Sequence, residues 1–315
     1  MTRLKWNKYA VTGAAGFIGS HIVEELLERG KHVVIIDNMV AGKRENLSFL
    51  NKYKKWEFWN EDVSDLDRMI ECLHGVDVVF HLAASKCTVC REDPHKDLMV
   101  NAMGSYNVFR ASELNGVKKV IHASTGSVLG GKPKSFYGVS KLAGETYLRA
   151  FKDYNPDFNF TAIRYHHVFG PRQEWNEYGG VIPIFITNIL ADEPITIFGD
   201  GTQVRYFTYV DDLVNFNLKC ESEFDGEFVN FANNMPTTLN ELADQLMEIM
   251  GKKVYTVYGD PKPGDIYKFN IEDNKYPSDL RASWCHQKRS LKKTVEYYKE
   301  VVRYIDSWTP QDTKQ

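Results

Sequence analysis

A glycine-rich segment close to the N-terminus limits what this chain can fold into. It follows a short apolar run at residues 9–12, and a helical repeat of apolar residues, from Ile18 to Leu27, comes after it. This order predicts a strand, a tight turn and a helix. Gly13 permits the turn, Gly16 lets backbone amides approach a diphosphate, and Gly19 lets the helix pack closely on the strand. A loop that needs only positive backbone angles is the competing interpretation.

The next strand ends on an acidic residue, and this favours the first interpretation. Residues 31–36 form the predicted strand, and Asp37 follows it about 20 residues beyond the glycines. A carboxylate at this position binds the hydroxyl pair of an adenosine ribose and repels a 2'-phosphate, so the expected cofactor is NAD rather than NADP. The segment predicts one half of a Rossmann-type dinucleotide-binding domain. Further cofactor contacts are expected beside the glycines and the acid, at Phe17, Ile18 and Asn38.

The alternation of strands and helices continues and predicts a parallel, doubly wound sheet. Further strands are expected at residues 56–59, 76–82 and 117–123. Asp62 follows the first of these, at the carboxyl edge where open α/β sheets bind ligands. Capping of the helix expected at residues 66–73 is an equally good role for Asp62. The same edge should carry further cofactor contacts at Val63, Leu82, Ala83 and Ala84.

A tyrosine and a lysine four residues apart carry the chemical signal. Tyr137 and Lys141 share one face of a helix that is expected to begin there. A nearby ammonium group favours the phenolate, so Tyr137 can transfer protons closer to neutral pH than free tyrosine does. Thr125 follows the strand at residues 117–123 and should face the same crevice, where its hydroxyl can bind the substrate oxygen. Either motif alone is commonly an ordinary helix pair or loop, but the dinucleotide fold favours catalysis.

Charge, hydropathy and cysteine content narrow the class of protein. The 315 residues carry a formal net charge of -3 without a basic excess, so neither nucleic acid nor an anionic membrane is an expected partner. No apolar run reaches about 18 residues, and the charged residues 1–7 do not resemble a signal peptide, so we expect a cytoplasmic protein. The five cysteines are odd in number. We interpret Cys87-x-x-Cys90 as part of a loop rather than a redox or zinc site, and we expect no metal.

Together these motifs resemble those of the extended short-chain dehydrogenases/reductases. The resemblance covers nearly the whole chain and rests on Gly13-x-x-Gly16-x-x-Gly19, Asp37, Asp62-Val63, His81-Leu-Ala-Ala, Thr125 and Tyr137-x-x-x-Lys141. Two further stretches, residues 164–173 and 199–212, are similar to substrate-domain signatures of nucleotide-sugar 4-epimerases and 4,6-dehydratases. The cofactor contacts that the resemblance implies also include Lys86, Asn101, Tyr137, Lys141 and Tyr165.

The resemblance also implies a domain organisation. An NAD-binding Rossmann domain is expected at residues 1–170 with part of 204–235, and a smaller, mostly C-terminal α/β domain for the nucleotide sugar at 171–203 and 236–315. Helices are expected in the second domain from residue 179 onward, at 239–250 and at 290–308. Members of the family commonly dimerise through two long helices, here at about 97–113 and 138–154, so a homodimer is expected.

Several positions match residues that bind substrate in the family. His167 stands where an asparagine is more usual near the substrate diphosphate, and Arg205 matches an arginine that reaches the phosphates. Lys262 is a further candidate anchor. Surface ion pairing is the alternative for Arg205 and Lys262, and a solvated loop charge is the alternative for Lys86. The other implied substrate contacts are Thr125, Gly126, Ser127, Tyr137, Gly180 and Val181.

The residues after Thr125 distinguish between reactions. The 4,6-dehydratases carry Thr-Asp-Glu where this chain has Thr125-Gly126-Ser127, so no group is evident that removes the C5 proton and protonates the departing C6 hydroxyl. Dehydration is therefore disfavoured, as is decarboxylation, whose enzymes generally carry an acid after the catalytic hydroxyl. The expected reaction is 4-epimerisation of a nucleotide-diphosphate sugar, with a UDP-hexose favoured. A net NAD(H)-dependent reductase or dehydrogenase and a non-catalytic dinucleotide-binding protein are the alternatives.

Overall fold

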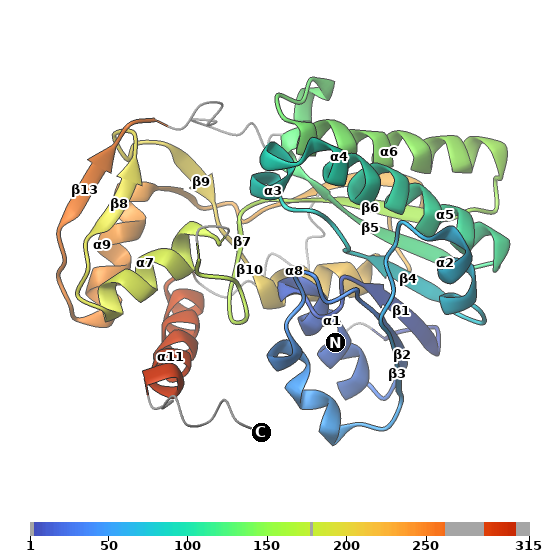
Figure 1. Cartoon of the computed structure of the whole chain (residues 1–315), viewed down its shortest axis with the longest axis horizontal. Coiled ribbons are helices and arrows are strands. Elements are labelled where there is room, and N and C mark those ends of the chain that lie inside the picture. Colours follow the sequence, from blue (N-terminus) through green and yellow to red (C-terminus); the bar gives the residue numbers. More distant parts are fainter. Residues whose placement is uncertain (1–2, 177–178, 262–286, 307–315) are drawn as a thin grey trace. The chain divides into compact units, whose positions relative to one another are not determined.

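The computed structural model describes residues 3–176, 179–261 and 287–306 (Figure 1). These residues form two compact units. The first contains residues 3–166 and 211–232, and the second contains residues 167–176, 179–210, 233–261 and 287–306. Lys262 and Cys285 lie outside the described residues. Each unit is considered by itself.

A parallel sheet of seven strands forms the centre of the first unit. Its order is β11-β6-β5-β4-β1-β2-β3, so the direction of winding reverses between β1 and β4. The Val- and Ile-rich strand β2 is buried from Val33 to Ile36, as expected for a strand that is covered on both faces. The predicted doubly wound parallel sheet is confirmed. The strands are β1 (Lys8–Thr12), β2 (His32–Ile36), β3 (Trp56–Trp59), β4 (Val78–His81), β5 (Lys119–Thr125), β6 (Phe160–Tyr165) and β11 (Glu227–Phe231).

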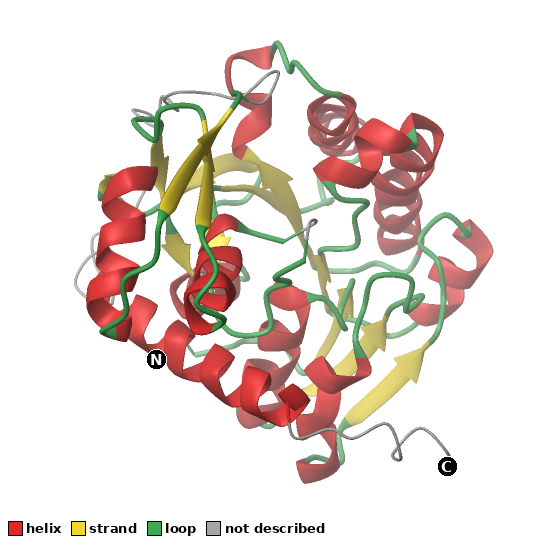
Figure 2. Cartoon of the chain, turned by 60° about the vertical axis from the view of Figure 1, so that its left-hand side comes forward, coloured by secondary structure: helices red, strands yellow, loops and turns green. Residues whose placement is uncertain are grey.

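Helices cover both faces of this sheet (Figures 1 and 2). One face carries α1 (Phe17–Glu28) and α8 (Val210–Lys219), and the other carries α2 (Leu66–Cys72), α5 (Gly104–Leu114) and α6 (Phe136–Tyr154). A buried apolar cluster fills the space beneath the second group, with Met69, Val108 and Leu148 from its three helices. Short helices complete the unit: η1 (Arg44–Lys52), α3 (Cys87–Glu92), α4 (Pro94–Asp97), η2 (Leu98–Met103) and η3 (Gly126–Gly131).

Two helical stretches of the first unit, the continuous segment from α4 to α5 and helix α6, supply residues of the predicted site. The segments α4, η2 and α5 follow one another without a break, and η2 between them is a π-helical segment. Helix α6 begins where the sequence predicts, because Ser135 caps it by accepting a hydrogen bond from the backbone N of Gly138 at 3.1 Å. The expectation of a loop at Cys87-x-x-Cys90 is wrong, since these residues begin α3.

In its described residues, the second unit combines three strand pairs with three helices. The predicted helix at 239–250 is confirmed as α9, which begins with a capping box between Thr238 and Glu241 and ends at Gly251 in the left-handed conformation. The pairs are β7 (Val168–Phe169) with β10 (Thr208–Tyr209), β9 (Val204–Tyr206) with β12 (Pro236–Thr238), and β8 (Ile195–Phe198) with β13 (Thr256–Gly259). The helices are α7 (Val181–Leu190), α9 (Leu239–Met250) and α11 (Gln287–Asp306).

None of the helices in the described ranges is long and apolar enough to cross a membrane. In the same ranges, histidine, cysteine and acidic side chains form no group of three or more that could hold a metal ion.

Candidate active site

The turn between β1 and α1 has the geometry that its glycines predict. Gly13 has a φ of 66°, in the left-handed region, and a Cβ atom there would lie 2.7 Å from the backbone N of Ala83. A Cβ atom at Gly19 would lie 2.2 Å from the carbonyl O of Gly13. Helix α1 therefore packs directly on the turn, and Gly16 stands at its N-terminal end. Such a helix end attracts the diphosphate of a dinucleotide.

Asp37 lies at the carboxyl end of the neighbouring strand and is held against the same turn. Its Oδ2 atom accepts a hydrogen bond from the backbone N of Ala15 at 2.8 Å, and its Oδ1 atom accepts one from Met39 at 2.9 Å. Burial raises the pKa of Asp37, while these two bonds act in the opposite direction. The carboxyl group is thus fixed beside the glycine turn, where it can receive the hydroxyl groups of a ribose.

Asp62 and Asn38 connect the loops that follow β3 and β2. The Nδ2 atom of Asn38 donates to Oδ2 of Asp62 at 2.6 Å, and the backbone N of Ser64 donates to Oδ1 at 2.8 Å. Burial alone raises the pKa of Asp62, but these hydrogen bonds outweigh it and the pKa is lowered. The alternative role of Asp62 as a helix cap is wrong, because Asp65 caps α2 by accepting from the backbone N of Arg68.

The loop after β4, residues 82–84, is held near the glycine turn by buried polar groups. The hydroxyl of Thr12 accepts hydrogen bonds from the backbone N atoms of Leu82 and Ala83, each at 3.2 Å, and lies 2.7 Å from Nδ1 of His81. Burial lowers the pKa of His81 to about 3, so its imidazole is neutral. His81 therefore supports the loop as a neutral hydrogen-bonding group.

Lys86 follows this loop as the residue before α3, and Asn101 of η2 is hydrogen-bonded to the loop at Ser85. Asn101 is fully buried, and its amide accepts from the backbone N of Ser85 at 2.8 Å and donates to the carbonyl O of Ser85 at 3.0 Å. Asn101 thus fixes the backbone beside the predicted cofactor site. Burial, and then the neighbouring charge of Lys43, lower the pKa of Lys86 to about 8. Two lysines at one place make the loop favourable for a phosphate group.

Tyr137 and Lys141 lie together in the first turns of α6. The Nζ atom of Lys141 is 6.0 Å from the centre of the Tyr137 ring and donates a hydrogen bond to the carbonyl O of Ala123 at 3.0 Å. Lys141 is 2 % exposed, and burial lowers its pKa to about 8. Ala123 lies two residues before Thr125 at the end of β5, so the predicted threonine, tyrosine and lysine belong to one corner of the first unit.

Two neighbours of Thr125 have defined contacts. Its Oγ1 atom accepts a hydrogen bond from the backbone N of Ser127 at 3.2 Å, which begins η3. In the sheet, Thr125 pairs with Tyr165, whose hydroxyl donates to Oδ1 of Asn217 at 2.7 Å. Burial raises the pKa of Tyr165, so this phenol stays protonated. Tyr165 is thereby excluded as a competing proton-transfer group.

Two residues that the sequence analysis did not single out shape the same corner. A Cβ atom at Gly126 would lie 2.3 Å from Cε1 of His166, so the imidazole takes the space that a side chain there would need. Glu145, one helical turn after Lys141, is 3 % exposed and accepts two hydrogen bonds from Arg164, at 2.8 and 2.6 Å. It also accepts one from Ser124 at 2.6 Å. This buried group braces the end of β5 just before Thr125.

The second unit holds the other predicted substrate residues that the structure describes. His167 has a φ of 38°, and its ring packs edge-on against Phe207 with the ring centres 6.0 Å apart. Arg205, two residues before Phe207, is 8 % exposed, and its Nη1 atom donates to the carbonyl O of Val204 at 3.0 Å. These two predicted phosphate anchors therefore come from neighbouring segments. Gly180 and Val181 stand at the N-terminal end of α7.

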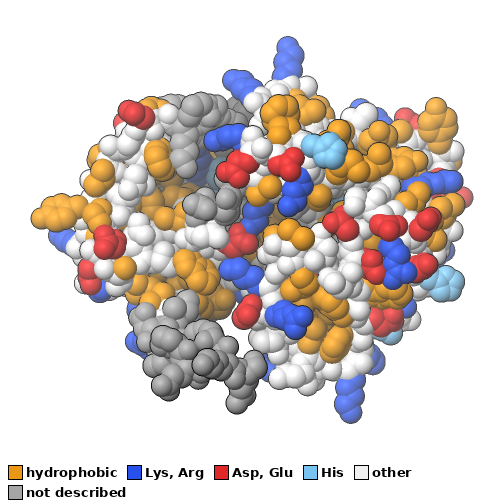
Figure 3. Space-filling model, viewed as in Figure 1, with side chains coloured by type: hydrophobic (Ala, Val, Ile, Leu, Met, Phe, Trp, Pro, Cys, Tyr) orange, Lys and Arg blue, Asp and Glu red, His pale blue; other side chains and the backbone are white. Residues whose placement is uncertain are grey.

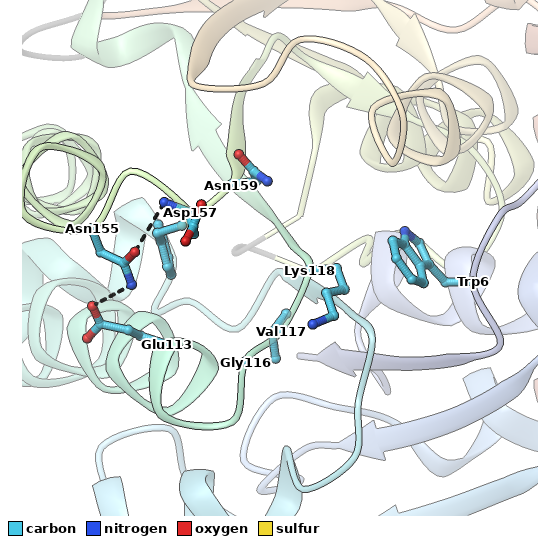
Figure 4. Close-up of a pocket in the computed structure, with 9 residues that line it drawn as sticks. Trp6, Glu113, Gly116, Val117, Lys118, Asn155, Asp157 and Asn159 are labelled. Carbon is cyan, nitrogen blue, oxygen red and sulfur yellow. Dashed lines mark hydrogen bonds between the residues drawn. The ribbon is translucent and has the colours of Figure 1, made fainter.

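A pocket of about 400 Å³ lies elsewhere in the first unit (Figure 4). It opens at the amino ends of β5 and β6, next to residues 116–118 and 157–159, whereas Thr125 and Tyr165 end those strands. Its polar walls are hydrogen-bonded to each other, since Nδ2 of Asn155 donates to Oε1 of Glu113 at 3.2 Å. The pocket is therefore separate from the predicted site.

The described side chains fit NAD. The glycine turn leaves no room for a Cβ atom at Gly13 or Gly19, and the carboxyl group of Asp37 is held beside that turn, at the predicted ribose position. The buried Nζ atom of Lys141 donates one of its three N–H groups to the carbonyl O of Ala123. Fold and site together define a Rossmann-type, NAD-dependent enzyme of the extended short-chain dehydrogenase/reductase type.

Comparison with known proteins gives the family. Residues 9–230 match the NAD dependent epimerase/dehydratase family, and the chain belongs to it. A putative UDP-glucose 4-epimerase of Methanocaldococcus jannaschii is 33% identical over 305 residues, which cover 92% of this chain and 97% of that protein. The predictions of an NAD-dependent epimerase and of NAD as cofactor are confirmed.

Two solved structures resemble the whole fold. The UDP-glucose 4-epimerase of Thermotoga maritima, solved with UDP-glucose, has a TM-score of 0.86 and 34% identity, covering 94% of this chain and 99% of that one. The UDP-N-acetylglucosamine 4-epimerase of Methanobrevibacter ruminantium, in complex with UDP-N-acetylmuramic acid, has a TM-score of 0.85 and 32% identity, with coverage of 94% and 99%. The sugars of these two proteins differ.

Proposed function

We propose that this protein is a nucleotide-sugar 4-epimerase acting on a UDP-hexose. Tyr137 takes the proton from the C4 hydroxyl while the C4–H bond breaks, and Lys141 favours the phenolate that this step requires. Thr125 binds the same oxygen. NAD, held by the glycine turn and Asp37, would supply hydride acceptance and hydride return at C4, so no cofactor would be consumed overall. Tyr137 returns its proton to the oxygen when the hydride reaches the opposite face of C4.

The contact between Gly126 and His166 is the observation that favours epimerisation over dehydration. Dehydration needs an acid after the catalytic hydroxyl, and here a glycine stands there with an imidazole against it. Burial, and then the charge of Arg164, lower the pKa of His166 to about 4, so at neutral pH its imidazole is uncharged and a poor proton donor. With Tyr137 as the proton-transfer group, oxidation and reduction at one carbon remain the supported chemistry.

We assign the remaining predicted contacts by unit. The first unit binds NAD through the glycine turn, Asp37 and the carboxyl edge of the sheet, and the second binds the nucleotide sugar. A diphosphate must stay bound while the 4-keto sugar turns over, and charged or hydrogen-bonding groups such as Arg205 and His167 suit that task. Gly180 and Val181 are proposed to contact the nucleotide, and Lys262 the phosphates.

We also propose a cytoplasmic homodimer that forms through α5 and α6. Apolar side chains are exposed along these helices, with Leu114 at 52%, Val139 at 54% and Tyr147 at 43%. Figure 3 shows hydrophobic side chains among charged ones over this part of the first unit. Burial of such side chains against a second copy is favourable. Sedimentation of wild-type protein and of a Val139→Glu/Tyr147→Glu variant tests the dimer, which the variant should dissociate.

The function is tested by incubating purified protein with UDP-, GDP- and dTDP-hexoses without added cofactor. Proton NMR and mass spectrometry of the products should reveal an isomer of unchanged mass that is inverted at C4, from a UDP-hexose in preference to the others. A product lighter by one water would contradict the argument from Gly126. A reaction that requires stoichiometric NADH would favour a net reductase.

A further inference from the structure

We propose that Asp97 is a positioning residue that keeps the side chain of Lys141 charged and correctly placed for proton transfer at Tyr137. The assignment rests on the proposed function, because it gives Asp97 a role in the same proton transfer. Asp97 is the last residue of α4, which packs against α6 (Figure 1). Asp97 is 3 % exposed.

The hydrogen bonds of Asp97 lead directly to the catalytic helix. Its Oδ1 atom accepts from Oγ of Ser140 at 3.0 Å and from Nδ2 of Asn101 at 2.6 Å. The same Ser140 hydroxyl lies 3.0 Å from the carbonyl O of Tyr137, and Ser140 immediately precedes Lys141. Asp97 therefore connects the helix turn that carries Tyr137 and Lys141 with Asn101 of η2, which fixes the backbone of Ser85 on the predicted cofactor side of the site.

The charge of Asp97 matters because Lys141 is buried, so its ammonium group loses most of its hydration. Burial lowers the pKa of Lys141, and the electrostatic interactions with Asp97 and then with Cys90 on α3 act in the opposite direction. His81 on β4 and His122 on β5 face the same ammonium, and burial lowers the pKa of both, so each is neutral at neutral pH. Among the described groups that act on Lys141, Asp97 is the carboxylate.

The direction of the effect follows from these charges. Loss of the negative charge at Asp97 lowers the pKa of Lys141 further, so less ammonium is present at neutral pH. Less ammonium means a weaker preference for the phenolate of Tyr137. The phenol then ionises at higher pH while Lys141 loses its proton at lower pH. Both changes narrow the pH range in which the two groups have the required charges.

Ultraviolet difference titration of the NAD-loaded protein measures the ionisation of Tyr137 directly, with Tyr137→Phe subtracted to isolate its signal. We expect the Asp97→Asn variant to move the midpoint upward by about one pH unit. The alkaline limb of kcat should move to lower pH, with KM changed by less than about twofold because substrate is not contacted. Asp65→Asn is the matched control, since Asp65 is an exposed cap on α2 and asparagine caps equally well. An unchanged midpoint in Asp97→Asn would overturn the proposal.

A double-mutant cycle separates the effect on Lys141 from a general structural effect. In a Lys141→Met background there is no ammonium group for Asp97 to stabilise, and the negative charge of Asp97 can only disfavour the phenolate of Tyr137. Asp97→Asn should therefore leave the ionisation midpoint of Tyr137 unchanged or lower it. A rise of the same size as in the wild-type background would assign Asp97 a role independent of Lys141 and overturn the proposal. If Asp97→Asn alone is insoluble, recovery of soluble protein by Asp97→Asn/Lys141→Met supports the pair, and failure of the double variant contradicts it.

The titration does not depend on the substrate. If the wild-type protein converts no nucleotide sugar but Asp97→Asn still raises the ionisation midpoint of Tyr137, the proposed function is wrong and the effect of Asp97 on Lys141 stands. If the protein is an epimerase but Asp97→Asn leaves the ionisation midpoint of Tyr137 unchanged, the proposed function stands and the role of Asp97 is wrong.

Discussion

The imidazole of His166 lies where a side chain at Gly126 would have to be. A Cβ atom at position 126 would approach Cε1 of His166 to 2.3 Å and Nδ1 to 2.6 Å. The two residues meet because β5 and β6 are neighbours in the sheet, with Thr125 opposite Tyr165. A carboxylic acid therefore cannot be placed next to Thr125 without moving the histidine.

Gly126→Ala should lower the free energy of unfolding by about 1–3 kcal/mol, because the added methyl group overpacks this contact. Urea denaturation of the purified variant measures the loss. His166→Ala opens space at the same place, so Gly126→Ala should cost less in that background than in the wild-type protein. Equal costs in both backgrounds would show that the two side chains do not compete for space.

Glu145 should be among the most sensitive polar positions of the first unit. Glu145→Ala leaves the guanidinium of Arg164 without its two hydrogen bonds at a mostly buried place, so we expect a loss of about 3–5 kcal/mol in the free energy of unfolding. Glu71→Ala, which removes an exposed partner of Arg68, is the control and should change it by less than about 1 kcal/mol. Similar losses for the two variants would contradict the bracing role.

Local sequence patterns predicted much of the fold and the chemical centre. The spacing of Gly13 and Gly19 after an apolar run identified the first turn, because tight packing there is a local requirement. Tyr137 and Lys141 could be paired since residues four apart share a helix face. The extent of α9 followed from its apolar repeat in the same way, whereas the extent of α6 was predicted from the family resemblance.

Contacts between distant segments were missed because nothing local encodes them. Asp97 meets Ser140, and Ser124 meets Glu145, only after α4, β5 and α6 have packed together. Asp62 and Asp65 are both of a residue type that caps helices. Asp65 is the cap because α2 begins at the next residue, Leu66, and residue type alone does not reveal where a helix begins. Cys87 and Cys90 begin a helix, which a short polar segment does not indicate by its composition.

Lys141 should give the stability of the protein a characteristic pH dependence. Its pKa is about 8 in the folded protein and 10.5 in an exposed lysine, so between these pH values the unfolded chain binds a proton that the folded one does not. The free energy of unfolding then gains up to about 1.4 kcal/mol per pH unit from this group as pH rises. Urea denaturation from pH 8 to 10 should show a smaller slope in Lys141→Met, and identical slopes would contradict a buried lysine.

Asp37 should govern the affinity for NAD. Asp37→Asn removes the charge that receives the ribose hydroxyls, so we expect the Kd for NAD to rise about tenfold or more, and the preference over NADP to shrink. Calorimetric titration of cofactor-free protein measures both constants. Asp65→Asn, an acid-to-amide change at an exposed site, should leave both unchanged. Undiminished NAD binding in Asp37→Asn would place the ribose elsewhere.

The central claim is that the hydride leaves C4 and returns to the same carbon. It is tested most directly with a UDP-hexose that carries deuterium at C4, incubated with wild-type protein and with Tyr137→Phe in the absence of added cofactor. The account predicts a C4-inverted product that retains its deuterium at C4, and a rate at least about a hundredfold lower for Tyr137→Phe. Deuterium lost from the product, or epimerisation that proceeds undiminished in Tyr137→Phe, would contradict it.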